Sequence, residues 1–362
     1  MSASVATLAR PGTYPAISLL LPVDGDPAEV VRMRLDRLAD DAVDRLRMEL
    51  GSDEVDAYDL RLRRAVDTVT VTHGQEGVAV YVGDHTEVVP LPVPVRERVV
   101  IDDTFATRDV VRALQRSPRY RVVVLGPRRT RLYEGVGVTL TEVQEPAFAG
   151  LAPIGPDLVG ARPATRGRVS RDQRRGGRVG SGIDGFVRTL DAALDPHVRR
   201  DPLPLVLVGS EPRLTAVAGA SRHRDQIVGT VRGARDLPER VHLAAQVWPI
   251  VESMLTRRTA EALAELDAVG GRHYASGVRD VWTLATQGRG ALLLVEEGYE
   301  QPACVDHANG TAEPTDDRDA PGVVDDLVDE IIEAVLGAGG RVHLVPDGTL
   351  GAHDRIAMKL RY

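Results

Sequence analysis

Seven arginines lie between residues 162 and 178, in a chain whose formal net charge is −8. They are Arg162, Arg166, Arg168, Arg171, Arg174, Arg175 and Arg178, and Asp172 is the acidic residue among them. Arginine stays protonated at neutral pH, and its planar guanidinium donates paired hydrogen bonds to phosphate oxygens. The cluster therefore predicts a surface that binds the phosphate backbone of a nucleic acid, more specifically RNA, rather than a sequence of bases.

Two adjacent glycines, Gly176 and Gly177, lie among these arginines in the sequence RRGGR. Without a Cβ they let the backbone approach a binding surface closely and adopt positive φ. A helix expected to begin near Ser181 adds free N–H groups and partial positive charge at the same end. Two other interpretations are a solvated basic loop with no specific partner and a nucleotide site. The nucleotide site lacks its usual motifs, because neither GxxxxGK[ST] nor GxGxxG is present.

The remaining reactive side chains form no recognisable catalytic or metal-binding pattern. The nine histidines are not paired at metal-ligand spacing, the only cysteine is Cys304, and no GxSxG motif holds a nucleophilic serine. His223 and His353 each have an aspartate nearby in the sequence, and both are expected to be solvated surface residues. The predicted core strands RVVVL and LPLVLV carry no acid, whereas two-metal nucleases need converging carboxylates. We therefore predict no catalytic residue, no metal and no cofactor.

The composition is that of a soluble globular protein. Of the 362 residues 43% are hydrophobic and 27% charged, while only 4% are aromatic, which argues against a base-stacking platform. No run of about 18 apolar residues could span a membrane. The apolar run from Ile17 to Leu21 is too short for a secretory signal and ends at Pro22. A cytoplasmic protein without membrane contact is expected.

Three domains of mixed sheets and helices are expected to position the basic segment, and the first spans residues 1–117. After an opening strand, Asp26 suits the N-cap of a helix that Gly51 would end. A second helix is predicted over residues 53–69. Two β-rich runs then form a hairpin that turns at residues 83–84.

The second domain, residues 118–245, is expected to carry the basic segment between a strand and a helix. Residues 149–182 show no sustained apolar period, and a segment of that length without elements is usually functional or disordered. The helix that follows has its apolar residues at helical spacing and is expected to end at Asp195-Pro196. Its predicted buried stripe is Ile183, Phe186, Val187, Leu190 and Leu194.

The third domain, residues 246–362, alternates helices with short apolar strands. A long amphipathic helix is expected over residues 247–269, then the helix GVRDVWTLATQG and the strand ALLLVEE. An acidic loop, HANGTAEPTDDRDAPG, precedes a helix expected over VVDDLVDEIIEAVLGAGG. This alternation predicts a compact α/β/α sandwich.

The whole chain resembles the archaeo-eukaryotic peptide release factor and Pelota superfamily, in its bacterial branch. The resemblance rests on the loop with RRGGR before the helix SGIDGFVRTLDAAL, on ISLLLPVDGDP near the start, and on YASGVRDVWTLATQGRGALLLVEEGY and GGRVHLVPDGTLGAHDRIAMKLRY towards the end. It implies an RNase H-like central domain. It also implies a 70S ribosome as partner, contacted at the A site through the rRNA of both subunits, with elongation factor Tu as an accompanying GTPase. Off the ribosome a monomer is expected.

The chain departs from this family at one decisive position. The family's loop holds Gly-Gly-Gln, and the glutamine helps place the water that attacks peptidyl-tRNA. Here Gly176 and Gly177 are followed by Arg178, which cannot accept a hydrogen bond, and Gln173 lies on the wrong side of the glycines. The resemblance with this departure predicts a non-enzymatic hibernation factor, made under stress. It would occupy the vacant A site and reach rRNA near the peptidyl transferase centre through the loop at 162–180.

Two alternatives stay open. One is a rescue or release factor that hydrolyses peptidyl-tRNA through a different arrangement of groups. The other is a stress-related RNA-binding or nuclease-like protein that acts away from the ribosome. Peptide release from stalled complexes would separate the first from hibernation, and magnesium-dependent cleavage of free RNA would support the second.

Overall fold

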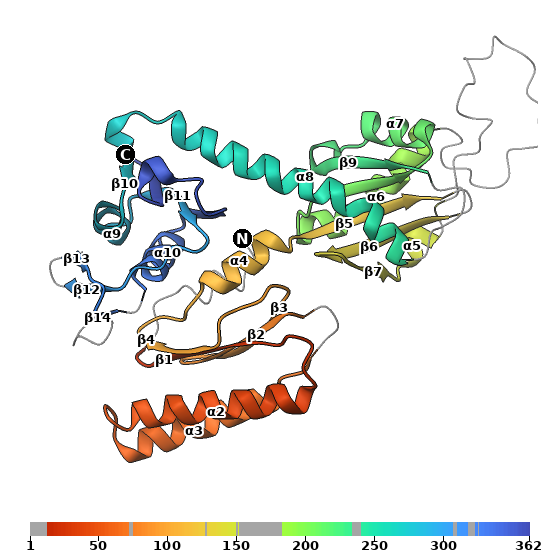
Figure 1. The fold of residues 1–362 in the computed structure, drawn as a ribbon. Coiled ribbons are helices and arrows are strands. Elements are labelled where there is room, and N and C mark those ends of the chain that lie inside the picture. Colours follow the sequence, from red (N-terminus) through yellow and green to blue (C-terminus); the bar gives the residue numbers. More distant parts are fainter. Residues whose placement is uncertain are drawn as a thin grey trace, which may run out of the picture. The chain divides into compact units, whose positions relative to one another are not determined.

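The computed structural model describes residues 13–71, 75–126, 129–149, 151, 183–233, 240–306, 310–317, 323–324 and 326–362. The chain divides into two compact units. One is formed by residues 1–116 together with 257–362, and the other by residues 117–256. Figure 1 shows the helices and strands of both units. No helix in the described ranges is long and apolar enough to cross a membrane.

A four-stranded antiparallel sheet forms the first half of one unit. Its strands, with the two helices that follow the first strand, are β1 (Ala16–Pro22), α2 (Ala28–Leu46), α3 (Ser52–Asp67), β2 (Gly77–Val82), β3 (Thr86–Leu91) and β4 (Arg98–Asp102). The strand order is β3-β2-β1-β4. The strands β2 and β3 form the predicted hairpin, with Val82 opposite Thr86 next to the turn.

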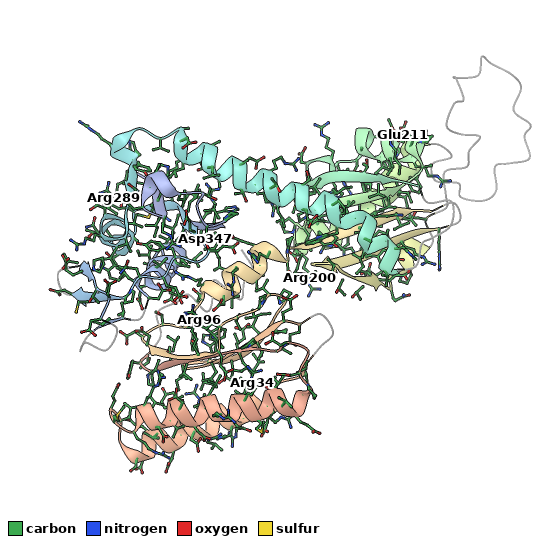
Figure 2. All side chains as sticks on the ribbon, in the orientation of Figure 1. Arg34, Arg96, Arg200, Glu211, Arg289 and Asp347 are labelled. Carbon is green, nitrogen blue, oxygen red and sulfur yellow. The ribbon has the colours of Figure 1, made fainter. Side chains whose placement is uncertain are left out.

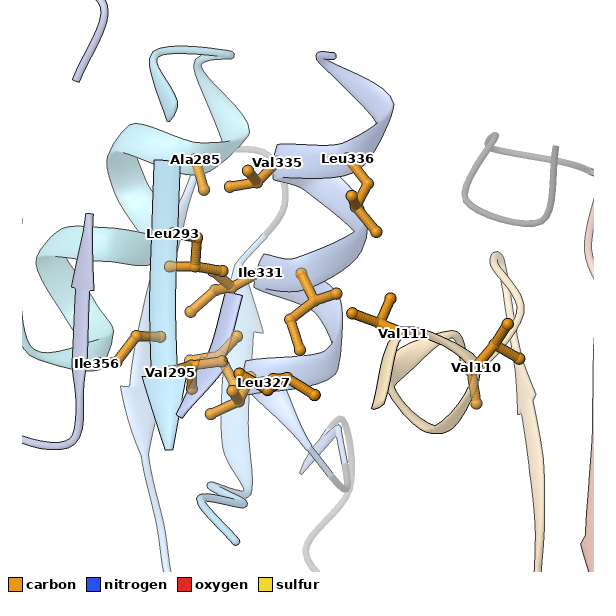
Figure 3. Close-up of a cluster of buried hydrophobic side chains, with 14 of the residues drawn as sticks. Val110, Val111, Ala285, Leu293, Val295, Leu327, Ile331, Val335, Leu336 and Ile356 are labelled. Atoms are coloured by element: carbon orange, nitrogen blue, oxygen red, sulfur yellow. The ribbon is translucent and has the colours of Figure 1, made fainter. Parts of the chain in front are cut away.

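Both faces of this sheet are covered. Leu19 and Leu21 of β1 pack against α2 and α3 on one side. Leu20 joins a second core that contains α4 (Arg108–Arg116) and residues of the C-terminal half of the unit. Figure 3 shows Val110 and Val111 of α4 with the labelled side chains of that core. Burial on both faces accounts for the nearly continuous apolar sequence of β1 and β2.

Two predicted helix ends in this half are wrong. The N-cap of α2 is Pro27, not Asp26, because the Asp26 carboxylate instead forms an ion pair with Arg34 at 2.7 Å. Figure 2 labels Arg34 on this helix. The helix ends at Leu46, before Gly51, which serves as the N-cap of α3. In both places a residue of a type that commonly caps a helix end has another role in the fold.

The C-terminal half of the same unit is an α/β/α sandwich, as predicted. Its principal elements are β10 (Tyr274–Ser276), α9 (Val278–Thr286), β11 (Gly290–Glu296), α10 (Leu327–Gly337), β15 (Arg341–Val345) and β16 (Ile356–Leu360). The sheet has the order β10-β16-β11-β15. Leu293 packs on the side of α9 and α10, whereas Leu292 packs on the other side with Leu266 of α8 (Arg240–Asp267).

The acidic segment before α10 contains strands rather than only a loop. A small antiparallel sheet is built from β12 (Ala303–Asp306), β13 (Thr311–Pro314) and β14 (Val323–Val324). Ala303 and Ala312 are buried in the core, and α9 packs on β13. Small buried residues within a polar segment carry little periodic signal, which is why sequence reasoning missed this sheet.

The other unit contains a mixed five-stranded sheet. Its elements are β5 (Arg119–Leu125), β6 (Thr130–Val136), β7 (Thr139–Val143), α5 (Pro146–Ala149), α6 (Ile183–Arg200), β8 (Leu205–Gly209), α7 (Glu211–Ala220), β9 (Ile227–Arg232) and the first part of α8. The order is β7-β6-β5-β8-β9, and β6 alone runs against the other strands. This is the RNase H-like arrangement that the family resemblance implies.

Two helices run further than the sequence predicts. The helix α6 continues through Pro196 to Arg200, although a proline inside a helix removes one backbone hydrogen bond. Its last turn is held because Val198 packs against the core and His197 Nε2 lies 3.1 Å from Glu145 Oε2. The helix α8 begins at Arg240, so the domain boundary predicted at residue 245 falls inside it.

Candidate nucleic-acid interface

The predicted binding residues lie outside the described part of the chain. They are Arg162, Arg166, Arg168, Arg171, Arg174, Arg175, Gly176, Gly177 and Arg178. Leu151 is the last described residue before this segment, and Ile183 is the first after it. The structure therefore describes the residues on either side of segment 152–182. We call these flanking residues, around Leu151 and Ile183, the frame of the basic segment.

Both ends of that frame are anchored in one hydrophobic core. Phe148 and Leu151, on the incoming side, are buried in the same cluster as Phe186 and Val187, on the outgoing side. The short helix α5 packs against β6 and α6. The predicted stripe of α6 is confirmed, since Phe186, Val187, Leu190 and Leu194 are buried and Ile183 packs against the same core. The basic segment thus starts and ends on a packed scaffold.

Three strands end at one edge of the sheet close to this frame. The strands β5, β8 and β9 are parallel, and Leu125 pairs with Gly209, which in turn pairs with Arg232. The chain passes from β5 to its antiparallel neighbour β6 through a short turn, and from β8 through α7 to its parallel neighbour β9, so both connections begin at this edge.

The amino end of α6 reaches the same edge. The far end of α6 lies beside the start of β5, where Arg119 and Asp201 form an ion pair at 2.6 Å. The helix has 18 residues and is therefore about 27 Å long. Near the amino end of α6, Phe186 and Val187 are buried in the same core as Leu125, the last residue of β5.

Additional arginines surround this edge. Arg213, in the first turn of α7, donates to the Leu125 carbonyl at 3.2 Å, and Arg232 donates to Glu211 at 3.1 Å. Figure 2 labels Glu211 at the start of α7. Arg131 lies 3.5 Å from Glu142, and Arg129 is exposed. Sequence reasoning did not select these arginines. Arg129 follows the predicted strand RVVVL and Arg213 follows the predicted strand LPLVLV, which was the available signal for these two, whereas the strand that ends at Arg232 was not predicted.

His223, predicted to be a solvated surface residue, is buried. Its Nε2 lies 3.0 Å from Asp195 Oδ1. Beside it the Ser221 hydroxyl donates to Asp191 at 2.6 Å, and the Arg222 backbone N–H donates to the same carboxylate at 3.1 Å. These contacts join α6 to the segment after α7. They do not form a catalytic triad, because the serine hydroxyl donates to an aspartate rather than to the histidine.

The second histidine, His353, is also not fully solvated. It is half-buried, and its Nδ1 contacts the Tyr274 hydroxyl. Among the described residues, no three His, Cys, Asp or Glu side chains come together in a way that could hold a metal ion. The strands β5 and β8, which correspond to the predicted core strands, carry apolar side chains and one buried arginine, Arg121.

Comparison with protein families gives a match over the part of the chain that carries this site. Residues 119–289 match the family described as "Bacterial archaeo-eukaryotic release factor family 3". The match covers just under half of the chain and includes the RNase H-like sheet and the whole basic segment. It confirms the resemblance to the archaeo-eukaryotic release factor superfamily. No curated protein matches the sequence.

Comparison with solved structures gives matches at low sequence identity and low structural similarity. An archaeal translation termination factor, aRF1, is 17% identical, with 99% of this chain and 95% of that chain covered and a TM-score of 0.24. Archaeal Pelota, in a ribosome-bound complex with ABCE1, is 13% identical over 81% and 75%, with a TM-score of 0.44. Dom34 of S. cerevisiae is 11% identical over 83% and 77%, with a TM-score of 0.39. Scores this low support no conclusion about activity.

Proposed function

We propose that this protein is a ribosome-associated factor that occupies the vacant A site of idle 70S ribosomes without releasing a peptide. The observation that carries the proposal is the position of RRGGR, residues 174–178, within the family match at 119–289, with Arg178 where release factors have glutamine. The segment keeps the arginines that bind phosphate and lacks the acceptor that positions water.

The frame of the central unit is suited to this role. A long basic segment that binds deep inside an RNA site needs flanking residues that are fixed in the folded protein. The flanking residues are fixed in this way, because they are buried together in one core: Phe148, Leu151, Phe186 and Val187. Arg129, which is exposed in the turn between β5 and β6, adds positive potential at the same edge.

The remaining parts of the proposal follow from the family. The segment 162–180 would contact rRNA of the large subunit near the peptidyl transferase centre, and the N-terminal sheet would face the decoding region of the small subunit. Elongation factor Tu would accompany the protein in the cytoplasm, and off the ribosome the protein would be a monomer. The proposed role is hibernation during stress, without enzymatic activity.

Co-sedimentation with purified 70S ribosomes tests the proposal. Wild-type protein should pellet with vacant ribosomes in preference to ribosomes that carry A-site tRNA. Replacing Arg174, Arg175 and Arg178 by alanine should weaken binding and should reduce the slope of log affinity against log salt by about one unit per lost phosphate contact. The matched control, replacement of the same three residues by lysine, keeps the charge and should keep most of the slope.

Each other outcome has a definite meaning. Equal binding of the alanine variant at every salt concentration would show that the basic segment is not the anchor. Peptide release by the wild-type protein would favour the rescue or release factor. Absence of ribosome binding, together with magnesium-dependent cleavage of free RNA, would favour the nuclease-like alternative.

A further inference from the structure

The strand β15 lies at the edge of the C-terminal sheet. It pairs in parallel with β11, and the strand order β10-β16-β11-β15 of the described residues leaves its other side, here called the outer edge, without a neighbouring strand. Both faces of β15 are covered. Leu344 is buried in the core that contains α10, and Val345 is buried in the core that contains Leu266 of α8. The outer edge is therefore the part of β15 where another strand would pair.

A side chain from the N-terminal half occupies this outer edge. Gln115, near the end of α4, donates from Nε2 to the Val342 carbonyl and accepts at Oε1 from the Leu344 N–H, each at 2.8 Å. A neighbouring strand would bond to the same two backbone groups. The Gln115 carboxamide thus takes the place of a fifth strand, although it lies more than two hundred residues away in the sequence.

The two ends of α4 are fixed to different degrees. At the start, Arg108 is buried and lies 2.9 Å from Asp326, and its backbone N–H donates to Asp329 at 3.1 Å. At the end, Arg116 is exposed and forms an ion pair with Glu297 at 2.5 Å, a type of contact that adds little stability. Helix ends also fray more readily than helix centres. The last turn of α4 can therefore open locally while its first turn stays docked.

The outer edge of β15 is complementary to itself. If two copies pair antiparallel with His343 opposite His343, Val342 lies opposite Leu344 and Arg341 lies opposite Val345. The Val342 carbonyl and the Leu344 N–H point outward, as their bonds to Gln115 show, so these two residues can exchange hydrogen bonds with the second copy. This register pairs apolar side chains directly and keeps the two arginines apart, which avoids the repulsion of opposed like charges.

We propose that β15 is a pairing edge for a second copy of this chain and that Gln115 closes the edge within each copy. The contact is autoinhibitory, because the carboxamide holds the two backbone groups that the second copy needs. When the last turn of α4 opens, the Val342 carbonyl and the Leu344 N–H become available for strand pairing. The proposal does not depend on the ribosomal function, because it concerns the free protein.

Removal of the carboxamide should favour the open edge. Loss of both hydrogen bonds leaves a carbonyl and an N–H without partners in the closed state, and should raise the opened fraction on the order of tenfold. A dimer requires an open edge in each copy. The association constant should therefore rise by the square of this change, on the order of a hundredfold.

Sedimentation equilibrium of the full-length protein over a wide range of concentrations tests the proposal. The variant Gln115→Met keeps the length of the side chain but forms neither hydrogen bond, and it should dimerise at concentrations where the wild-type protein is monomeric. Gln287→Met is the matched control. It adds the same apolar side chain at an exposed position directly after α9 and should associate no more than the wild type.

A second change separates strand pairing from other kinds of association. Val342→Pro, combined with Gln115→Met, removes the N–H that position 342 would donate to the second copy. Proline is tolerated in edge strands, where it blocks pairing on the outer side. The double variant should therefore return to the monomeric state.

Two results would overturn the proposal. One is a folded Gln115→Met variant whose association constant equals that of the wild type. The other is a dimer that persists in the double variant, because such a dimer does not use β15. If Gln115→Met does not fold, judged by circular dichroism, Gln115→Glu decides the question by the same measurement. Its carboxylate can accept from the Leu344 N–H but cannot donate to the Val342 carbonyl, so this variant should also dimerise more strongly than the wild type.

Discussion

At the scale of single residues, Asp191 has a role that its sequence position does not reveal. It is buried on α6, accepts hydrogen bonds from the Ser221 hydroxyl and the Arg222 backbone N–H, and lies next to the His223–Asp195 pair. A carboxylate that satisfies two donors from a distant segment fixes that segment in place. This explains how the polar sequence SRHRD becomes partly buried.

The replacement Asp191→Ala should destabilise the central unit by about 1–3 kcal/mol, because it leaves a buried hydroxyl and a backbone N–H without their acceptor. Urea denaturation followed by circular dichroism measures the change. Asp184→Ala is the control on the same helix, since Asp184 is exposed in the first turn and should contribute less than about 1 kcal/mol. Equal effects of the two changes would refute a structural role of Asp191.

A second prediction at this scale concerns position 178. If arginine there is what prevents peptide release, Arg178→Gln should raise the rate of peptidyl-tRNA hydrolysis on ribosomes on the order of a hundredfold, the size of effect expected from positioning a reactant. A peptide-release assay with stalled ribosomal complexes measures this rate. Arg178→Ala removes the charge without adding an acceptor and should remain inactive. An active wild-type protein would contradict the hibernation proposal.

At the scale of elements, the pairing of β5 with β6 depends on a glycine, Gly135, opposite a tyrosine ring. Tyr120 lies directly opposite Gly135, and its ring covers the glycine so closely that an added Cβ would lie 2.4 Å from a ring carbon. The Tyr120 hydroxyl donates to the Gly137 carbonyl at 2.9 Å, next to the turn into β7. The fully buried ring thus fastens the hairpin to the neighbouring strand.

The change Gly135→Ala should therefore destabilise the central unit by about 1–3 kcal/mol through overpacking. The same change at Gly219, in α7, meets no atom within 4 Å and should stabilise the unit by up to about 1 kcal/mol through helix propensity. Thermal unfolding of the two variants measures the opposite shifts. A neutral Gly135→Ala would mean that the ring moves aside without cost.

Elements differ in how well sequence reasoning predicts them. The strands β1, β5, β8 and β11 and the stripe of α6 were predictable because buried apolar residues repeat at strand or helix spacing. The ends of α2 and α6 were not. A capping residue or a proline changes the local free energy by only a few kcal/mol, and an ion pair or core contact from elsewhere can outweigh it.

At the scale of the whole molecule, the first 116 residues do not complete their own core. One face of the N-terminal sheet is covered by α2 and α3, but Leu20 and Tyr81 on the other face pack with α4 and with residues beyond 257. Residues 117–256, in contrast, form a compact unit of their own. Along the chain, residues 1–116 form the first half of one unit, residues 117–256 form the other unit, and residues 257–362 complete the first unit.

Separate expression of the pieces tests this organisation. Residues 117–256 should unfold cooperatively on their own. Residues 1–116 alone should bind the dye ANS, because an apolar sheet face becomes exposed, and mixing with residues 257–362 should reduce that binding. Fluorescence titration measures the dye binding, and circular dichroism shows whether each fragment is folded. A fragment 1–116 that is stable and does not bind ANS would contradict the shared core.

The amino-acid sequence by itself determined which segments are apolar strands and amphipathic helices, where seven arginines and two glycines gather, and the superfamily that this order of elements resembles. These are local properties, set by the spacing of side chains along the chain. Only the tertiary structure decided that His223 is buried, that the acidic segment before α10 forms strands, and that α10 packs against the N-terminal half. The burial of His223 and the packing of α10 depend on partners more than twenty residues away, and the strands before α10 depend on pairing with one another and on packing against α9. Burial and charge pairing are decided where such segments meet.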